Sequence, residues 1–288
     1  MKEQEYKIEN IKSFELADIF DCGQCFRWNK QEDGSYTGVF KGNVMNVQKE
    51  EDTVTFKGIC NGDIKEVVED YFDLSRNYED IKEKLSKIDQ HVKTSIEYGQ
   101  GIRILNQDLW EMIISYIISA NNNIPRIKGI IDRLSKNYGK EIDWNGEKYY
   151  TFPTVEELKD VSIDEYRRLG AGFRDVRLYE TVQMVLDKKV DLEQMQKNPN
   201  TFEVREQLLT LSGVGPKVAD CILLFSTLKR FEVFPIDVWV RRVMNELYIK
   251  NEEETKVNKK ELEKLAQEKF GNLAGIAQQY LFYWKREA

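Results

Sequence analysis

The segment that most restricts the fold of this chain is residues 211–225, LSGVGPKVADCILLF, in which two glycines flank one valine and a proline follows. A helix is expected to end at the first of these residues, because Gly213 and Gly215 supply the backbone freedom that a very tight turn needs. Pro216 then suits the first turn of the next helix, where its missing N–H leaves no bond unmade. The spacing predicts a helix–hairpin–helix, with the hairpin at residues 208–220.

Such a hairpin is a candidate site for a nucleic-acid phosphate. The amides of Gly213, Val214 and Gly215 and the N-terminus of the next helix would act as outward donors, and glycines let an anion approach closely. Contacts of this kind hold DNA by its backbone and carry no sequence information. The alternative is an ordinary tight turn between helices, for which one glycine would be enough. The second glycine favours the phosphate site.

Lys217 opens a helix that is otherwise apolar. One explanation is a surface lysine that touches a phosphate. However, Asp237 follows in the apolar stretch FPIDVWV, and a partly buried acid needs a partner or a task. Asp237 could instead cap a helix expected at residues 238–248, and the two roles are compatible.

The chain changes character near residue 100, and the change predicts an α+β protein. Residues 36–48 and 53–56 alternate in the manner of short antiparallel strands joined by hairpins. Beyond residue 100 one helical pattern follows another. We therefore expect an N-terminal antiparallel β-sheet domain with flanking helices at residues 1–100, and an all-α domain at residues 101–288.

The histidine and cysteine content excludes several kinds of site. His91 is the only histidine, so a two-histidine metal site is excluded, and a Ser-His-Asp triad would have to use it. Cys22 and Cys25 form a C-x-x-C motif, but Cys60 and Cys221 do not supply a second pair, and zinc is not expected. The four thiols are too few and too scattered for a disulfide framework. Catalysis by carboxylate, lysine, cysteine or tyrosine remains.

The net charge of −7 argues against a nucleic-acid ligand only at first sight. Residues 1–100 hold 21 acidic and 14 basic side chains, whereas residues 101–288 hold 29 of each. A basic face is therefore allowed on the second part, although basic segments such as residues 121–136 could also be solvated helix faces. No stretch is apolar enough to cross a bilayer, and MKEQEYKIEN is unlike a signal peptide, so a cytoplasmic protein is expected.

Several segments together resemble the helix–hairpin–helix (HhH-GPD) DNA glycosylase superfamily. There, a hairpin like LSGVGPKVAD is followed by a catalytic lysine and then by an aspartate, as in PIDVWV here. Within the superfamily the chain is similar to 8-oxoguanine DNA glycosylase/AP lyases, and this similarity implies a TBP-like N-terminal domain and an enzyme of base excision repair. The matches run in order over residues 20–285. They are GQCFRW at 23–28, SANNNIPRI at 119–127, LGAGFR at 169–174, KVADC at 217–221 and AQQYLF at 277–282.

The resemblance implies that Lys217 is the nucleophile. Its neutral amine would attack C1′ of the damaged nucleotide, expel the base and remain attached as a Schiff base, after which β-elimination cuts the strand on the 3′ side. Asp237 would stabilise the positive charge that develops on the sugar. Because the attacking amine must be neutral, we expect the helix N-terminus and the apolar surroundings to lower the pKa of Lys217.

The resemblance also implies a pocket for the flipped base. Cys221 would pack against one face of the base and Phe282 would cover the other. Gln278 would hydrogen-bond the Watson–Crick edge. The carbonyl of Gly23 would accept the N7 hydrogen that 8-oxoguanine has and guanine lacks. From the residues alone, Cys221 and Phe282 would be assigned to ordinary core packing.

Four further positions match residues that meet the opposite strand. Asn121, Arg126 and Arg174 would fill the vacated stack and contact the orphaned cytosine, and Phe173 would be the wedge beside it. Phe173 stands where eukaryotic members carry tyrosine, which bears on the strictness of cytosine selection. Trp239 stands where they carry histidine near a phosphate, and an indole donates only one hydrogen bond.

No cofactor is required on this interpretation. Backbone carbonyls at Leu209, Leu211 and Val214 could hold a structural monovalent or calcium ion. An iron–sulfur cluster of the endonuclease III type is excluded, because no cysteine follows Cys221. The expected partner is double-stranded DNA that contains oxidised guanine, with no membrane, and the expected state is a monomer near the nucleoid of a prokaryotic cell. The alternatives are a related glycosylase for another damaged base and a non-catalytic helix–hairpin–helix DNA-binding module.

Overall fold

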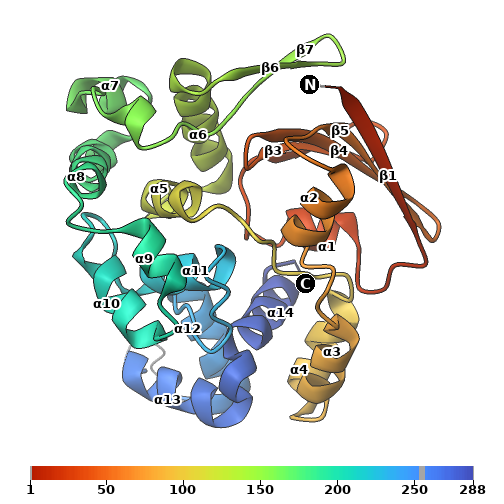
Figure 1. Cartoon of the computed structure of the whole chain (residues 1–288). Helices are drawn as coiled ribbons and strands as arrows, with labels where there is room; N and C mark the ends of the chain where they lie inside the picture. The colour runs from red at the N-terminus through yellow and green to blue at the C-terminus, as the bar shows by residue number, and fades with distance from the viewer. Residues whose placement is uncertain (1, 253–256, 288) are drawn as a thin grey trace.

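The structure is a computed structural model that describes residues 2–252 and 257–287. Figure 1 shows a sheet with its own helices on one side of the molecule and a larger group of helices on the other. The α+β class and the order of its two parts are confirmed. Within the described ranges, no helix is both long and apolar enough to span a membrane.

The N-terminal sheet is antiparallel, in the spatial order β1-β5-β4-β3-β2. Its strands are β1 (Glu3–Glu9), β2 (Trp28–Lys30), β3 (Tyr36–Phe40), β4 (Asn43–Glu50) and β5 (Thr53–Ile59). The β3–β4 turn is tight because Lys41 and Gly42 both adopt positive φ, as type I′ hairpins require. The sequence analysis found β3, β4 and β5, but it missed the edge strands β1 and β2.

Aromatic side chains form the core beneath this sheet. The Trp28 ring stacks on Phe20 with centroids 4.2 Å apart, and Tyr36, Phe56 and Phe72 are buried around them. The short helices of this part are α1 (Leu16–Phe20), α2 (Ile64–Tyr71), α3 (Tyr78–Ser86) and α4 (Gln90–Tyr98). Helix α2 begins where the Asp63 side chain caps two amides.

The second part is built around α5 (Leu109–Ser119), in which every residue except the last is buried. The other helices are α6 (Ile124–Tyr138), α7 (Ile163–Arg168), α8 (Asp175–Leu186), α9 (Leu192–Lys197), α10 (Thr201–Thr210), α11 (Pro216–Phe225), α12 (Val238–Met244), α13 (Lys259–Phe270) and α14 (Ala274–Glu287). Helix α12 continues into one π-helical turn, Asn245–Ile249.

The helical part also contains a β-hairpin that the sequence analysis did not anticipate. Strands β6 (Glu141–Trp144) and β7 (Glu147–Tyr150) are joined by Asn145 and Gly146, both at positive φ. Asn-Gly between short alternating runs is a strong hairpin signal, so the sequence did carry the information. The hairpin packs Ile142 and Trp144 against the outer face of the N-terminal sheet, so it ties the two parts together.

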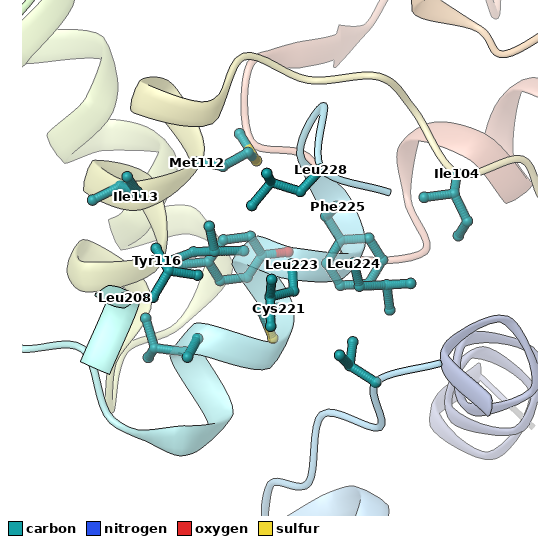
Figure 2. Close-up of a cluster of buried hydrophobic side chains, with 14 of the residues drawn as sticks. Ile104, Met112, Ile113, Tyr116, Leu208, Cys221, Leu223, Leu224, Phe225 and Leu228 are labelled. Atoms are coloured by element: carbon teal, nitrogen blue, oxygen red, sulfur yellow. The ribbon is translucent and has the colours of Figure 1, made fainter. Parts of the chain in front are cut away.

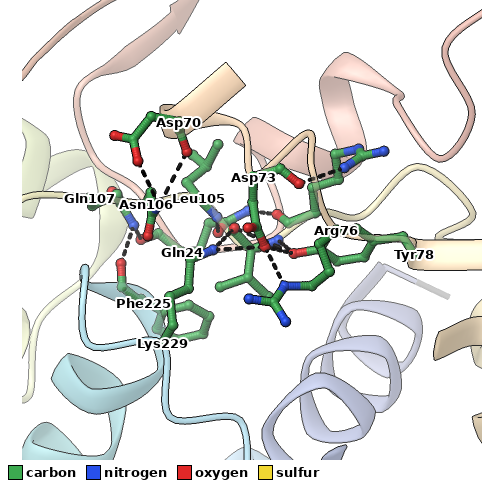
Figure 3. Close-up of polar contacts among 12 residues, drawn as sticks. Gln24, Asp70, Asp73, Arg76, Tyr78, Leu105, Asn106, Gln107, Phe225 and Lys229 are labelled. Atoms are coloured by element: carbon green, nitrogen blue, oxygen red, sulfur yellow. Dashed lines mark hydrogen bonds and ion pairs between the residues drawn. The ribbon is translucent and has the colours of Figure 1, made fainter. Parts of the chain in front are cut away.

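A buried polar network also joins the two parts (Figure 3). Lys229 donates to the Ile104 carbonyl and pairs with Asp73 at 3.3 Å, and Asp73 also accepts from Tyr78. Burial lowers the pKa of Lys229 to about 8, because its charged form is taken out of water. The network fixes the loop before α12 relative to the N-terminal part.

Candidate active site

The predicted helix–hairpin–helix is present between α10 and α11. Gly213 has φ +83°, and the Val214 amide donates to the Leu211 carbonyl at 3.1 Å, which closes the turn. Gly215 caps α11, and no atom lies within 4 Å of the position that its Cβ would occupy. The backbone at Gly215 is therefore open to close approach by an anion.

Helix α8 holds the hairpin from behind. The Thr181 hydroxyl donates to the Ser212 carbonyl at 3.0 Å, and the Ser212 hydroxyl donates to Glu180. The aliphatic part of Arg177 packs on Gly213, because its Cδ lies 2.8 Å from the position of a Cβ there. A side chain at residue 213 would collide with Arg177, so glycine is required on steric grounds as well as by its φ.

Lys217 lies in the first turn of α11 and is half-buried. Its Nζ lies 5.6 Å from the centre of the Tyr116 ring. Cys221 follows one helical turn later, within a cluster of buried side chains that includes Tyr116 (Figure 2). The amine therefore lies between an aromatic face and a thiol at the start of a helix.

The expected lowering of the Lys217 pKa is not found in the DNA-free protein. The charges of Cys221 and Asp237 raise the pKa of Lys217, and together they outweigh burial. Burial raises the pKa of the Cys221 thiol to about 11. The charge of Asp237 also raises the pKa of Lys217, but this effect is smaller than that of burial, which lowers it.

Asp237 has the capping role that the sequence suggested. It is the N-cap of α12, and its carboxylate accepts the Val240 amide N–H at 2.8 Å. Phe234 and Ile236 are buried just before it, so the carboxylate lies at the edge of an apolar region. Lys217 and Asp237 influence each other electrostatically but make no direct ion pair.

Three of the four residues predicted to bind the base lie close together around α14. Gln278 and Phe282 line a narrow crevice between α12 and α14 that is too tight to hold a water molecule. Gly23 has φ +90°, and a Cβ there would lie 3.8 Å from the Phe282 ring. Gln278 is 6% exposed, and its Oε1 has no hydrogen-bond partner among the described residues. A hydrogen-bonded ligand would satisfy this buried acceptor.

The residues predicted to meet the opposite strand form a second group. Phe173 is 56% exposed, whereas Arg174 is 2% exposed and its guanidinium lies 4.2 Å from the Phe173 ring centre. Arg174 donates to the carbonyls of Ala120, Asn121 and Ala171. Burial, with the charges of Arg126 and Arg177, lowers the pKa of Arg174. In the free protein Arg174 therefore uses its donors internally.

Arg126 stands in the first turn of α6, beyond the Asn123 cap, and its Nη2 lies 3.6 Å from the Cβ position of Gly172. Asn121 has φ +52°, a conformation that asparagine tolerates better than most residues. The structure therefore brings Asn121, Arg126, Phe173 and Arg174 together where α5, α6 and the turn before α8 meet. Figure 1 shows these elements on the same side of the helical part.

Some residues of the site were missed by the sequence analysis. Arg177 bridges the hairpin and Phe173, with its guanidinium 5.3 Å from the Phe173 ring centre. Arg242 lies 5.3 Å from the ring centre of Trp239, which is 57% exposed. Helical spacing could have indicated both. Arg177 follows Phe173 by four residues and Arg242 follows Trp239 by three, and side chains three or four residues apart are neighbours on a helix.

Metal ligation by side chains has no candidate within the described ranges, where no three His, Cys, Asp or Glu residues gather. All four cysteines are buried and unpaired by disulfides. At the hairpin, the Leu211 carbonyl already accepts one amide N–H and keeps a second lone pair. The carbonyl ion site predicted from the resemblance therefore stays a prediction.

Comparison with known families gives two matches that together span most of the chain. Residues 7–113 match the family described as 8-oxoguanine DNA glycosylase, N-terminal domain. Residues 114–270 match the HhH-GPD superfamily of base excision DNA repair proteins.

Individual relatives agree. A probable N-glycosylase/DNA lyase of Methanothermobacter thermautotrophicus is 32% identical over 245 residues, which cover 78% of this chain and 76% of that protein. The apo structure of Clostridium acetobutylicum 8-oxoguanine glycosylase/lyase is 43% identical, with a TM-score of 0.92 and 98% of each chain covered. The same enzyme in complex with double-stranded DNA that contains cytosine opposite 8-oxoG also has a TM-score of 0.92, at 43% identity, and covers 100% of this chain and 98% of that one.

Proposed function

This chain belongs to the HhH-GPD superfamily of base excision DNA repair proteins, and we propose that it excises 8-oxoguanine from DNA, preferentially opposite cytosine, and then cuts the strand through a lysine Schiff base. The observation that carries the proposal is the placement of Lys217. Its amine stands at the open end of a hairpin suited to a DNA phosphate, and within the electrostatic reach of Asp237.

In the proposed reaction the Lys217 amine attacks C1′ as the bond from C1′ to the base breaks. Asp237 stabilises the positive charge that the sugar carries at that point, and the bonding electrons leave with the base. Opening of the sugar ring then gives the Schiff base, and loss of a proton from C2′ expels the 3′ phosphate. Because the pKa of Lys217 is raised in the free protein, the amine must lose a proton after DNA binds and before it attacks.

Recognition of the base uses the group around α14. The Gly23 carbonyl accepts the N7 hydrogen of 8-oxoguanine, and guanine would present an acceptor to the same carbonyl. The Gln278 Oε1, which lacks a protein partner, accepts a hydrogen from the Watson–Crick edge. Phe282 and the buried thiol of Cys221 cover the two faces of the base, and each face contributes about 1–3 kcal/mol by analogy with stacking on aromatic rings.

Recognition of the opposite strand uses the second group. Phe173 is exposed and serves as the wedge, Asn121 enters the vacated stack, and Arg126 and Arg174 donate to cytosine. For Arg174 this requires that its guanidinium exchange carbonyls of the protein for the O2 and N3 acceptors of cytosine. Phe173 has no hydroxyl to add a polar contact, so we expect some excision opposite adenine. We propose that the protein acts on duplex DNA as a monomer in the cytoplasm, without a cofactor.

Single-turnover excision tests the proposal. Duplexes that carry 8-oxoguanine opposite cytosine, adenine, guanine or thymine are compared with an undamaged duplex and with duplexes that carry an alkylated purine. The expected result is fastest release of 8-oxoguanine opposite cytosine and none of guanine. Lys217→Gln should bind the damaged duplex and release nothing. Faster release of another lesion would contradict the substrate, and activity in Lys217→Gln would contradict the mechanism.

A further inference from the structure

Two side chains of α14 hold the loop that carries Gly23. The inference drawn from them rests on the proposed function of the Gly23 carbonyl. We propose that Gln279 and Arg286 are positioning residues: they fix the Gly23 carbonyl relative to Phe282, and through it they set the discrimination between 8-oxoguanine and guanine. The proposal concerns residues next to the base-contacting Gln278 and Phe282, and neither residue needs to touch the base.

The contacts before Gly23 come from one helix. Gln279 is 2% exposed, and its Nε2 donates to the Cys22 carbonyl at 2.6 Å. Arg286 donates from Nη2 to the Asp21 carbonyl. The two carbonyls that precede Gly23 are thus both bound from α14. The loop cannot slide along α14 without breaking these two hydrogen bonds.

Arg286 also connects the loop to the ring that would cover the base. Its guanidinium lies 5.3 Å from the centre of the Phe282 ring, and its Nη1 lies 3.0 Å from the position of a Cβ at Gly23. The same side chain therefore packs against both the acceptor residue and the stacking residue. Gly23 itself has φ +90°, a conformation that only glycine adopts readily. Any side chain at this position would be strained and would meet Arg286.

The chain after Gly23 is held by residues outside α14. The Gln24 side chain is fully buried, donates to the carbonyls of Ile19 and Arg103, and accepts the Leu105 amide N–H at 2.9 Å. Gln107 donates to the Gln24 carbonyl at 2.8 Å and to the Phe225 carbonyl at 3.0 Å (Figure 3). Because Phe225 is the last residue of α11, Gly23 is tied to the same helix that carries Lys217.

Both neighbours of Gly23 are therefore bound through buried hydrogen bonds, Cys22 to α14 and Gln24 through Gln107 to α11. A fixed acceptor discriminates well. When guanine is bound, its N7 acceptor faces the Gly23 carbonyl, and a fixed carbonyl cannot move away to relieve the repulsion. Of the groups that hold it, Gln279 and Arg286 act from α14, whereas Gln24 is part of the interface between the two parts of the chain. Changing Gln279 or Arg286 should therefore loosen the acceptor without disrupting that interface.

Binding measurements in a Lys217→Gln background test this, since no turnover then complicates the affinity. Arg286→Met and Gln279→Met are compared on three duplexes of one sequence, which contain 8-oxoguanine, guanine or a tetrahydrofuran abasic-site analogue opposite cytosine. Lys285→Met is the matched control. It removes the same charge from the neighbouring position of α14, where Lys285 pairs with Glu246 at 2.6 Å.

We expect each test variant to reduce the ratio of affinities for 8-oxoguanine and guanine by tenfold or more, with the affinity for the abasic analogue changed less than twofold. The control should keep the ratio. An unchanged ratio in a folded Arg286→Met protein would overturn the proposal, and so would an equal loss on all three duplexes, which would make Arg286 a general DNA contact. Arg286 is partly exposed, so this variant tests the proposal even if Gln279→Met fails to fold. If the Lys217→Gln parent itself does not prefer 8-oxoguanine, the proposed function fails instead.

Discussion

Replacement of Asp237 by asparagine or by alanine separates the two roles that its position gives it. The carboxylate caps α12 through the Val240 amide N–H at 2.8 Å, and its charge raises the pKa of Lys217. Asparagine caps helices about as well as aspartate does, whereas alanine loses about 1 kcal/mol. We expect Asp237→Asn to unfold in urea within about 0.5 kcal/mol of the wild type, and Asp237→Ala to be less stable by about 1 kcal/mol.

The catalytic effect should be the same in both variants, because both remove the charge. Loss of the charge at residue 237 lowers the pKa of Lys217, so more of the amine is neutral at a given pH. The rise of abasic-site cleavage with pH should therefore move to lower pH, while excision of 8-oxoguanine falls by about 10²-fold or more for want of charge stabilisation. Single-turnover cleavage of an abasic duplex across a pH series measures the first effect. An undisplaced pH profile would refute the electrostatic reasoning, and an asparagine variant as unstable as the alanine variant would refute the capping assignment.

Three further predictions concern stability and DNA binding. Burial raises the pKa of Glu111 to about 7, so the folded protein keeps a proton that the unfolded chain releases above about pH 4.5. The free energy of unfolding that this proton contributes is therefore lost as pH rises from about 4.5 to 7. In urea titrations, Glu111→Gln should remove up to about 3 kcal/mol of this pH dependence of stability. An unchanged pH dependence would contradict the raised pKa. Arg205 pairs with buried Asp220 at 2.6 Å, so Arg205→Met should lower the free energy of unfolding by about 3 kcal/mol, and a loss below about 1 kcal/mol would mean that water reaches the carboxylate. Trp239→Ala should leave the free energy of unfolding unchanged but weaken duplex binding about tenfold in fluorescence anisotropy. An unchanged affinity would show that the exposed indole does not contact the DNA.

Local signals in the sequence predicted the fold well where they were strong. The glycine spacing at 213 and 215 placed the helix–hairpin–helix, and the succession of helical patterns after residue 100 predicted the helical part. Edge strand β1 was missed because it is mostly polar and none of its residues is buried, and β2 was missed because it is only three residues long. The β6–β7 hairpin was missed although Asn145–Gly146 signals it, because its strands are only four residues long.

The candidate site was predicted by resemblance more than by pattern. Nothing in the local sequence distinguishes Gln278 from any other helical glutamine, and its orphaned Oε1 is visible only once α14 is packed against α12. The pKa of Lys217 was expected to fall because helix position and burial both act that way. The structure adds the charges of Cys221, one helical turn away, and of Asp237, twenty residues away in the chain, and both act in the opposite direction. Electrostatics of this kind depend on tertiary distances that a single sequence does not contain.

Borohydride trapping on a duplex with 8-oxoguanine opposite cytosine tests the central claim most directly, because reduction converts a Schiff base into a stable protein–DNA bond. The account predicts a covalent adduct with the wild type and none with Lys217→Gln, although that variant still binds the duplex. Peptide mapping of the adduct should place the bond at Lys217. Binding without any trapped adduct in the wild type, or an adduct that survives in Lys217→Gln, would contradict the account.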